Sequence, residues 1–295
     1  MTSTAESPAA SRPAPVAAVD ASAGGSVETV GRLSDQRVDV VIPVYNEAHI
    51  LAANVHSLHD FLTSSLPVAW RIIIADNASN DATWLVADRL QGSLPHVSAV
   101  HLDRKGRGLA LKAVWSASSA TVLTYMDVDL STALTGFLPL IAPVLSGHSE
   151  ISIGSRLRPG SRVQREWQRE VLSRSYNIIV RATLAAQFRD AQCGFKAISQ
   201  RAARCLLPFV RDDGWFFDTE LLLLAQRAGV RVFEVPVDWV EDRDSRVNVP
   251  KTVKDDLRGI WRLRRSFWSG SPARSALQVG PASVISGSEQ INVSD

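Results

Sequence analysis

Short runs of apolar residues recur along the chain and predict a set of buried β-strands. Most of these runs lack a strict alternation of polar and apolar positions, which is typical of strands covered on both faces. The runs are Val38 to Tyr45, Trp70 to Asp76, Val97 to Leu102, Thr121 to Asp127, Glu150 to Ser155 and Val230 to Trp239.

Helical patterns lie between the first of these runs. Leu51, Val55, Leu58 and Leu62 follow one another at a spacing that puts them on one face of a helix. Further helices are expected near 81–91 and 106–118. Strands that alternate with helices predict an α/β fold, Rossmann-like, with a mostly parallel central sheet and helices on both faces.

The two ends of the chain differ from the rest in composition. Residues 1–34 are rich in Ala, Ser, Pro and Gly, and this segment and 270–295 are expected to be disordered tails. The 295 residues are enough for one large domain or two small ones, and 45% hydrophobic and 21% charged residues suit a soluble globular protein. The formal net charge is +2, so charge gives no support to a nucleic-acid partner.

Polar residues gather where the expected strands end. They are Tyr45, Asn46 and Glu47 after the first strand, Asp76 and Asn77 after the second, Asp103, Arg104 and Lys105 after the third, and Asp127 and Asp129 after the fourth. Turn residues and helix caps would explain some of them. Because ligands of open α/β sheets bind beyond the carboxyl ends of the strands, charge at four successive strand ends favours a binding site.

Asp127 and Asp129 are the most specific of these residues. Residues i and i+2 point to the same side of a strand, so the two carboxylates repel unless a cation lies between them. Hard oxygen ligands suit Mg²⁺ or Mn²⁺, and either ion can bridge a diphosphate. The pair therefore predicts a metal site.

Together these segments resemble the inverting glycosyltransferases of family 2, which have the GT-A fold. The likeness covers about 36–250 and is closer to the dolichyl-phosphate β-glucosyltransferases than to the mannosyl enzymes among the polyprenyl-phosphate hexose synthases. It implies a single catalytic domain over 36–250. The matching segments are Ile42 to Glu47, Asp76 to Asp81, Lys105 to Ala110, Met126 to Asp129, Gly154 to Arg156, Asp190 to Lys196 and Trp239 to Arg246.

The resemblance assigns roles to the strand-end residues. Asp127 and Asp129 would hold the metal on the donor phosphates. Lys105 would lie by the diphosphate or the base. The residues that it implies for the nucleoside are Pro43, Tyr45, Glu47 and Asp76, and Asn77 departs from a family pattern that often has a second Asp there.

A lipid monophosphate acceptor would be largely a dianion at neutral pH and therefore a nucleophile without a strong base. Arg156 and Arg246 are the candidates to bind it, since a guanidinium pairs with phosphate as a fork. Asp190 matches an acidic residue that the family places near the sugar, and it is expected to orient the acceptor or a sugar hydroxyl. Lys196 is expected to add to the phosphate site or to pair with Asp190.

Two later segments bear on membrane contact. Glu166 to Phe188 has a helical apolar side with arginines nearby, and 251–268 alternates apolar residues, two of them Trp, with Lys and Arg. A basic amphipathic helix that bears Trp is typical of an interfacial anchor, although a core-packed helix with a solvated basic face shows the same pattern. No segment is long and apolar enough to span a membrane, and no secretory signal is recognised. We therefore expect a cytoplasmic protein, peripherally attached to the cytoplasmic membrane.

The expected activity is metal-dependent transfer of a hexose, glucose from UDP-glucose, to a polyprenyl phosphate with inversion, as in cell-envelope glycolipid synthesis. Two enzymatic alternatives use GDP-mannose as the donor or a small soluble acceptor. An alternative of another class is a membrane-associated interaction protein that has lost catalysis. The two retained carboxylates argue against it, because a site without a cation gains nothing from their repulsion.

Overall fold

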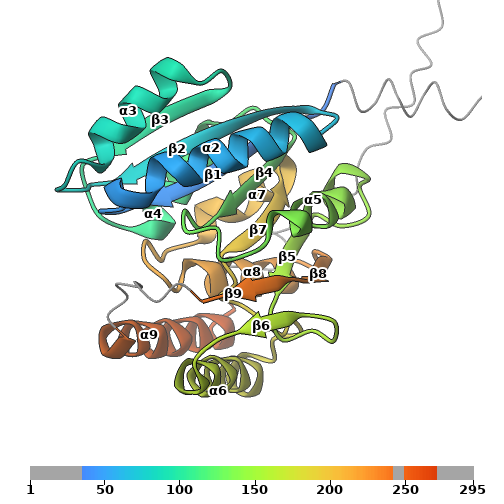
Figure 1. Ribbon diagram of the computed structural model, residues 1–295. Coiled ribbons are helices and arrows are strands. Elements are labelled where there is room, and N and C mark those ends of the chain that lie inside the picture. Colours follow the sequence, from blue (N-terminus) through green and yellow to red (C-terminus); the bar gives the residue numbers. More distant parts are fainter. Residues whose placement is uncertain (1–34, 242–248, 271–295) are drawn as a thin grey trace, which may run out of the picture. The chain divides into compact units, whose positions relative to one another are not determined.

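The computed structural model describes residues 35–241 and 249–270 (Figure 1). Apart from Gly270, the two expected tails lie outside these ranges. The centre of the fold is a seven-stranded sheet in the order β3-β2-β1-β4-β7-β5-β8. Its strands are β1 (Arg37–Val44), β2 (Ala69–Asn77), β3 (Val97–Leu102), β4 (Val122–Met126), β5 (Ile151–Ser155), β7 (Phe195–Ser199) and β8 (Val232–Pro236).

Most neighbours in this sheet are parallel. Strand β1 pairs in parallel with β2 and β4, β2 with β3, and β5 with β8. Strand β7 runs antiparallel to both of its neighbours, β4 and β5. A second, two-stranded sheet joins β6 (Arg162–Gln164) to β9 (Asp238–Val240) in parallel. The expected α/β architecture with a mostly parallel central sheet is confirmed.

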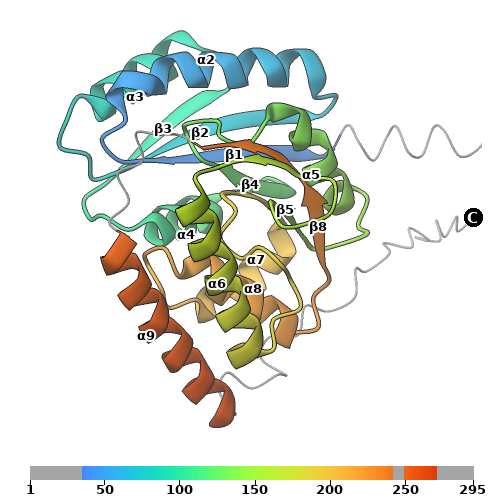
Figure 2. The same cartoon turned by 60° about the horizontal axis from the view of Figure 1, so that its bottom comes forward.

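Helices cover both faces of the sheet (Figure 2). Helices α2, α3 and α5 lie on one face, and α4, α7 and α8 lie on the other, with α6 and α9 on that same side. The helices are α2 (Ala48–Ser65), α3 (Thr83–Ser93), α4 (Arg107–Ala117), α5 (Phe137–Leu145), α6 (Trp167–Leu184), α7 (Gln200–Leu206), α8 (Phe217–Arg227) and α9 (Val249–Trp268), and short 3₁₀ turns span Leu134–Gly136 and Leu207–Phe209.

The inner parts of strands β1 and β2 are mostly apolar because their side chains contribute to two cores. Val41 and Ile73 are paired across β1 and β2, and both pack on the side of α4. The next pair, Ile42 and Ile74, packs on the opposite side under α2. Successive side chains of a strand point to opposite faces, so helices on both faces require apolar residues at every position.

The last expected strand, Val230 to Trp239, is divided between the two sheets. Strand β8 ends at Pro236, which lacks the N–H group that would continue the ladder. Val237 is buried, and Trp239 then lies in β9 beside β6. The short strands β6 and β7 are absent from the expected set.

Helix α9 is anchored to the rest of the domain through one of its faces. Ile260 and Leu263 are buried in the core on the α4 side of the sheet. Arg262 donates to both carboxylate oxygens of Glu220, at 2.6 and 2.9 Å, and Glu220 is 1% exposed. A forked ion pair with a buried carboxylate fixes both the position and the rotation of the helix.

Asp256 lies on the same buried face of α9. Gln192 donates to its Oδ2 atom at 2.9 Å, whereas its Oδ1 atom has no hydrogen-bond partner in the described part of the chain. Burial raises the pKa of Asp256 to about 7. The unfolded chain ionises this carboxyl near its ordinary value, so the folded state loses stability as pH rises from about 4 through 7.

Asp256→Asn should therefore stabilise the protein at alkaline pH. We expect a gain in the free energy of unfolding of at most about 4 kcal/mol at pH 8 and little change at pH 4, because the amide cannot ionise. Urea unfolding across this pH range would measure it. Asp255→Asn is the control, since Asp255 is half exposed on the same helix. An equal pH dependence of stability in wild type and Asp256→Asn would contradict the prediction.

Candidate active site

The loops that follow β1 and β2 are joined by side chains. The backbone N–H of Asn80 donates to Asn46 Oδ1, and the N–H of Asn46 donates to Ser79 Oγ, both at 2.9 Å. The N–H of Glu47 donates to Thr83 Oγ1 at 2.8 Å. Asn46 has a φ angle of +58°, a conformation that Asn adopts more readily than most residues with a side chain. Glu47 is thus presented from a fixed backbone.

Asp76, at the end of β2, is fully buried and already hydrogen-bonded. Its Oδ2 atom lies 2.6 Å from His101 Nδ1, and its Oδ1 atom accepts the N–H of Ser79 at 3.3 Å. The His101 ring also lies 5.2 Å from the Trp84 ring, measured between centroids. Pro43 is on the neighbouring strand β1. Both carboxylate oxygens of Asp76 thus have a partner within the protein.

Lys105 lies where β3 gives way to α4. Its Nζ atom is 3.3 Å from the centroid of the Tyr45 ring, a cation–π contact between the first and third strand ends. The next residue, Gly106, donates its N–H to Asn77 Oδ1 at 2.6 Å. A Cβ at Gly106 would come within 2.6 Å of the Asp213 carbonyl oxygen. A residue with a side chain would therefore not fit at this position without a shift of the backbone.

The acidic pair lies just beyond the end of β4. The side chain of Asp127 is 42% exposed, and its backbone N–H donates to the carbonyl of Gly194 at 3.2 Å. A Cβ on Gly194 would come within 1.8 Å of Asp127 Oδ2, so this carboxylate rests directly on the glycine backbone. Asp129 Oδ1 accepts the N–H of Ser131 at 2.9 Å, and Asp129 also lines a hollow of about 270 Å³.

The two carboxylates influence each other. Loss of hydration in its recess raises the pKa of Asp127, Arg107 opposes that effect, and the charge of Asp129 raises the pKa again. The net direction is upward. A carboxylate whose ionised form is disfavoured gains from a nearby cation, which is the arrangement expected of a metal ligand.

Arg107, the first residue of α4, supplies positive charge to this pair. Its Nη2 atom donates to Asp127 Oδ1 at 2.6 Å, and its Nη1 atom lies 3.7 Å from Asp218 Oδ2. Asp218 is 2% exposed and also accepts the hydroxyl of Tyr125. Arg107, Asp218 and Tyr125 are absent from the expected site. The one signal in the sequence is an acidic residue in the apolar start of α8, where a charge is costly unless it is paired.

Asp190 and Arg156 form a buried forked pair. Arg156 Nε and Nη2 each donate to Asp190 at 2.8 Å, and the backbone N–H of Arg156 adds a third bond at 3.0 Å. The guanidinium also lies over the Trp239 ring, 5.4 Å from its centroid. Burial alone would raise the pKa of Asp190, but the charge and hydrogen bonds of Arg156 lower it below its ordinary value. Asp190 is therefore built to stay ionised and to orient Arg156.

Lys196 pairs with Asp218, whereas a phosphate or Asp190 was the expected partner. It is 2% exposed, its Nζ atom donates to the Cys193 carbonyl at 2.6 Å, and it lies 3.0 Å from Asp218 Oδ1. A buried ammonium is stable only with such partners, and here it neutralises Asp218. The other expected phosphate ligand, Arg246, falls in 242–248, outside the described residues.

Comparison with known proteins identifies the family. Residues 39–207 match the model described as glycosyl transferase family 2. The chain belongs to this family. The expected enzyme class, glycosyltransferase, is thereby confirmed.

Curated relatives support this assignment. The glycosyltransferase AglD of Haloferax volcanii is 40% identical over 233 residues, which are 78% of this chain and 37% of AglD. The dolichyl-phosphate beta-glucosyltransferase ALG5C of Trichomonas vaginalis is 28% identical over 77% of this chain and 70% of its own length. The dolichyl-phosphate beta-glucosyltransferase of Saccharomyces cerevisiae is 23% identical over 69% and 67%. The chain thus spans little more than a third of AglD and about two thirds of the other two.

Solved structures show the same fold. Glucosyl-3-phosphoglycerate synthase from Mycobacterium tuberculosis, in complex with Mn²⁺, UDP and glucosyl-3-phosphoglycerate, is 17% identical with a TM-score of 0.58. The match covers 79% of this chain and 81% of that one. At such an identity the likeness shows the fold alone, and the fold is GT-A.

Gly194→Ala should disable the acidic pair without unfolding the domain. The added methyl group would displace the Asp127 carboxylate, because it cannot share the space of Oδ2. We expect the affinity for Mn²⁺ in the presence of UDP to fall at least about tenfold, as for other small displacements of a site. Calorimetry would measure it. The control is Gly92→Ala, since a Cβ at Gly92 meets no atom within 4 Å. Unchanged Mn²⁺ affinity in a folded Gly194→Ala variant would contradict the role of this contact.

Proposed function

We propose that this glycosyltransferase moves glucose from UDP-glucose to a polyprenyl phosphate, with inversion at the anomeric carbon and with a divalent cation at Asp127 and Asp129. One observation carries the proposal: the exposed carboxylate of Asp127, pressed against Gly194 beside Asp129 at the end of β4. Relatives named dolichyl-phosphate beta-glucosyltransferases support the choice of sugar and acceptor.

The residues fit Mg²⁺ or Mn²⁺ bound together with a diphosphate. No group of three or more potential His, Cys, Asp or Glu ligands occurs within residues 35–241 and 249–270. Magnesium ions commonly take one or two carboxylates and complete their shell with water and substrate phosphates, so an acidic pair is a sufficient donor set. When bound, the cation would neutralise charge on the departing nucleotide diphosphate.

In this proposal the nucleoside binds at the loops after β1 and β2, beside Pro43, Tyr45, Glu47 and Asp76. The diphosphate binds at the start of α4. Support comes from the fixed loop geometry and from Lys105, whose ammonium lies over Tyr45 next to the amino end of α4. Positive charge near the amino end of a helix suits a phosphate.

The proposed transfer is a single displacement. A phosphate oxygen of the acceptor forms a bond to the anomeric carbon, and the bond from that carbon to the UDP oxygen breaks, with the electron pair leaving on UDP. The acceptor is already anionic, so no residue has to remove a proton. Asp190 suits a positioning residue, since its lowered pKa and its three bonds from Arg156 leave it a poor base. The proposal gives the acceptor phosphate to Arg156 and Arg246.

An enzyme that acts on a lipid acceptor must contact a membrane surface. Helices α6 and α9 are the candidates for this contact. The two helices touch, and both expose large apolar side chains. These are Trp167, Val171 and Ile178 on α6 and Leu257, Trp261 and Trp268 on α9. No helix within the described ranges has the length and hydropathy to cross a bilayer. The proposal is therefore peripheral attachment at the cytoplasmic membrane.

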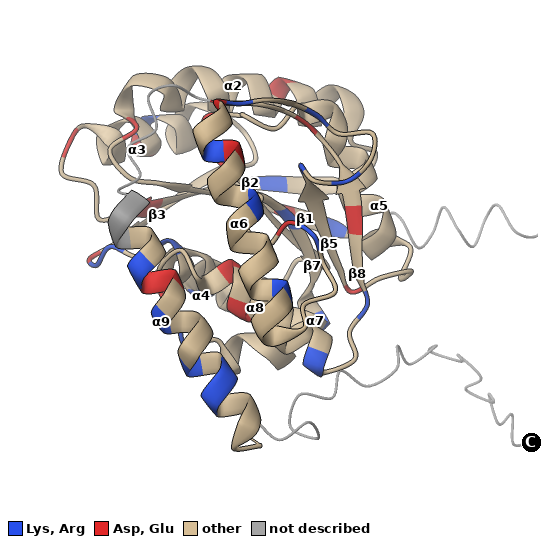
Figure 3. Ribbon diagram, turned by 90° about the horizontal axis from the view of Figure 1, so that it is seen from below, with Lys and Arg blue, Asp and Glu red and all other residues tan. Residues whose placement is uncertain are grey.

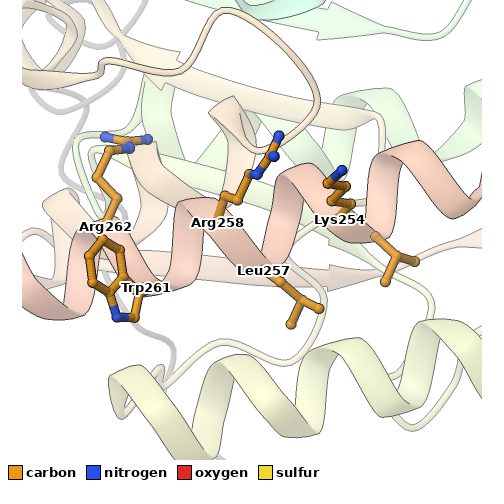
Figure 4. Close-up of a pocket in the computed structure, with 6 residues that line it drawn as sticks. Lys254, Leu257, Arg258, Trp261 and Arg262 are labelled. Atoms are coloured by element: carbon orange, nitrogen blue, oxygen red, sulfur yellow. The ribbon is translucent and has the colours of Figure 1, made fainter.

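The exposed face of α9 combines apolar and basic side chains. Leu257 and Trp261 point to the side of α6, whereas Lys254 and Arg258 point to the opposite side (Figure 4). They border a hollow of about 710 Å³ that is almost wholly apolar. Basic residues continue along the helix to Arg265 (Figure 3). An apolar strip with flanking cations suits a bilayer that contains anionic lipids.

A donor panel tests the proposed reaction. With Mn²⁺ and a short polyprenyl phosphate, UDP-glucose should give glycolipid faster than GDP-mannose, UDP-galactose or UDP-N-acetylglucosamine. Asp129→Asn should lower turnover at least about a hundredfold, the usual cost of losing a charge-stabilising group at a transition state. Chromatography of radiolabelled product would measure both.

Asp88→Asn is the matched control for the panel, because Asp88 is exposed on α3 and bonds only to Gln91 among the described contacts. Its turnover should equal that of wild type. If only GDP-mannose gives product, UDP-glucose is not the donor. If only a water-soluble acceptor is glycosylated, polyprenyl phosphate is not the acceptor. Full activity of Asp129→Asn would contradict the metal site.

The paired change Leu257→Ser and Trp261→Ser should release the protein from membranes. Both side chains are at least half exposed, so the fold should survive, while the lost apolar burial should weaken partition about tenfold or more. Sedimentation with vesicles that contain phosphatidylglycerol would measure it. Leu85→Ser, at an equally exposed leucine of α3, is the control. Equal binding by the paired variant and wild type would rule out this surface.

A further inference from the structure

We infer that Arg107 makes metal binding depend on the nucleotide, by holding Asp127 while the donor is absent and releasing it when a diphosphate arrives. The inference rests on the proposed function, since it concerns the same acidic pair. Its basis is the 2.6 Å hydrogen bond from Arg107 Nη2 to Asp127 Oδ1. This bond places a fixed positive charge at the atom that a cation would need.

The guanidinium of Arg107 is enclosed on several sides. Its side chain is 9% exposed, and it lies over the rings of Trp215 and Tyr125, 4.6 and 5.1 Å from their centroids. The carboxylate of Asp218 lies 3.7 Å away on the inner side. These acidic and aromatic neighbours stabilise the guanidinium in place of water. Asp218 can hold it near the site when its hydrogen bond to Asp127 breaks.

Arg107 and a divalent cation compete for Asp127. The guanidinium bonds to Oδ1, and Oδ2 lies against the backbone of Gly194, so both oxygens already have a close neighbour. A cation that approached the pair would also be repelled by the guanidinium a few ångströms away. In the absence of nucleotide, Arg107 therefore lowers the affinity of the site for the metal.

A nucleotide diphosphate reverses this balance. It brings negative charge to the start of α4, where Arg107 and Lys105 are both located. The Nη2 group can then donate to a phosphate oxygen in place of Asp127 Oδ1, while Nη1 stays beside Asp218. Metal and nucleotide thus favour each other, and by linkage the factor is the same in both directions. Such coupling limits occupancy of the site by metal alone.

Calorimetric titration at pH 8 tests the inference, with Mn²⁺ alone and Mn²⁺ with saturating UDP. Arg107→Gln should bind Mn²⁺ alone about tenfold more tightly than wild type, and the gain in affinity on adding UDP should shrink by a similar factor. Arg71→Gln is the matched control: it breaks another arginine–aspartate pair, with Asp39, early in β1 and β2 and away from the strand ends that form the site. Its Mn²⁺ affinity should equal that of wild type.

The outcomes separate the two proposals. If wild type shows no Mn²⁺-dependent binding of UDP, the proposed function fails. If wild type shows this coupling but Arg107→Gln binds Mn²⁺ alone no more tightly, the inference about Arg107 fails and the residue has a structural role. Should Arg107→Gln unfold, Arg107→Met removes the charge but keeps an unbranched apolar side chain between the rings of Trp215 and Tyr125, and it leaves Asp218 paired with Lys196. It should show the same gain in affinity for Mn²⁺ alone, and no gain would overturn the inference.

Discussion

Two carboxylates at the end of a buried strand repel each other, and the residues around them are arranged to balance that charge. Asp127 and Asp129 follow β4 directly and are partly exposed at the end of a strand that is buried throughout. Arg107 pairs with Asp127, and Asp218 behind it pairs with Lys196. Acidic and basic side chains thus alternate from the partly exposed Asp127 through Arg107 and Asp218 to the buried Lys196.

The segment from Asp190 to Lys196 supports this arrangement at three points. Asp190 fixes Arg156 by three hydrogen bonds. Gly194 leaves the space that the Asp127 carboxylate occupies, and Lys196 neutralises Asp218 below it. Helix α9 reaches the same segment through the contact of Asp256 with Gln192. Helix α9 is therefore in contact with the same segment that positions Asp127 and Arg156.

The sequence was sufficient for the elements whose signal is local. Runs such as Val38 to Tyr45 are buried on both faces, and the acidic pair stands at a strand end where an open sheet binds ligands. The sequence was insufficient for contacts between side chains that lie far apart along the chain. Lys196 meets Asp218 because β7 lies beside β4 and α8 packs below, a strand order that no local pattern encodes. The pairing of Arg107 with Asp127 has the same origin, and so does the burial of Asp76 by His101.

The most direct test of the account is the position of a metal ion at the acidic pair. Crystals grown with Mn²⁺ and UDP, measured at the manganese absorption edge, would locate the ion by its anomalous scattering. The account predicts a peak within about 2.5 Å of an oxygen of Asp127 or Asp129, bridging to the diphosphate. A peak bound to the nucleotide but remote from both carboxylates would contradict it.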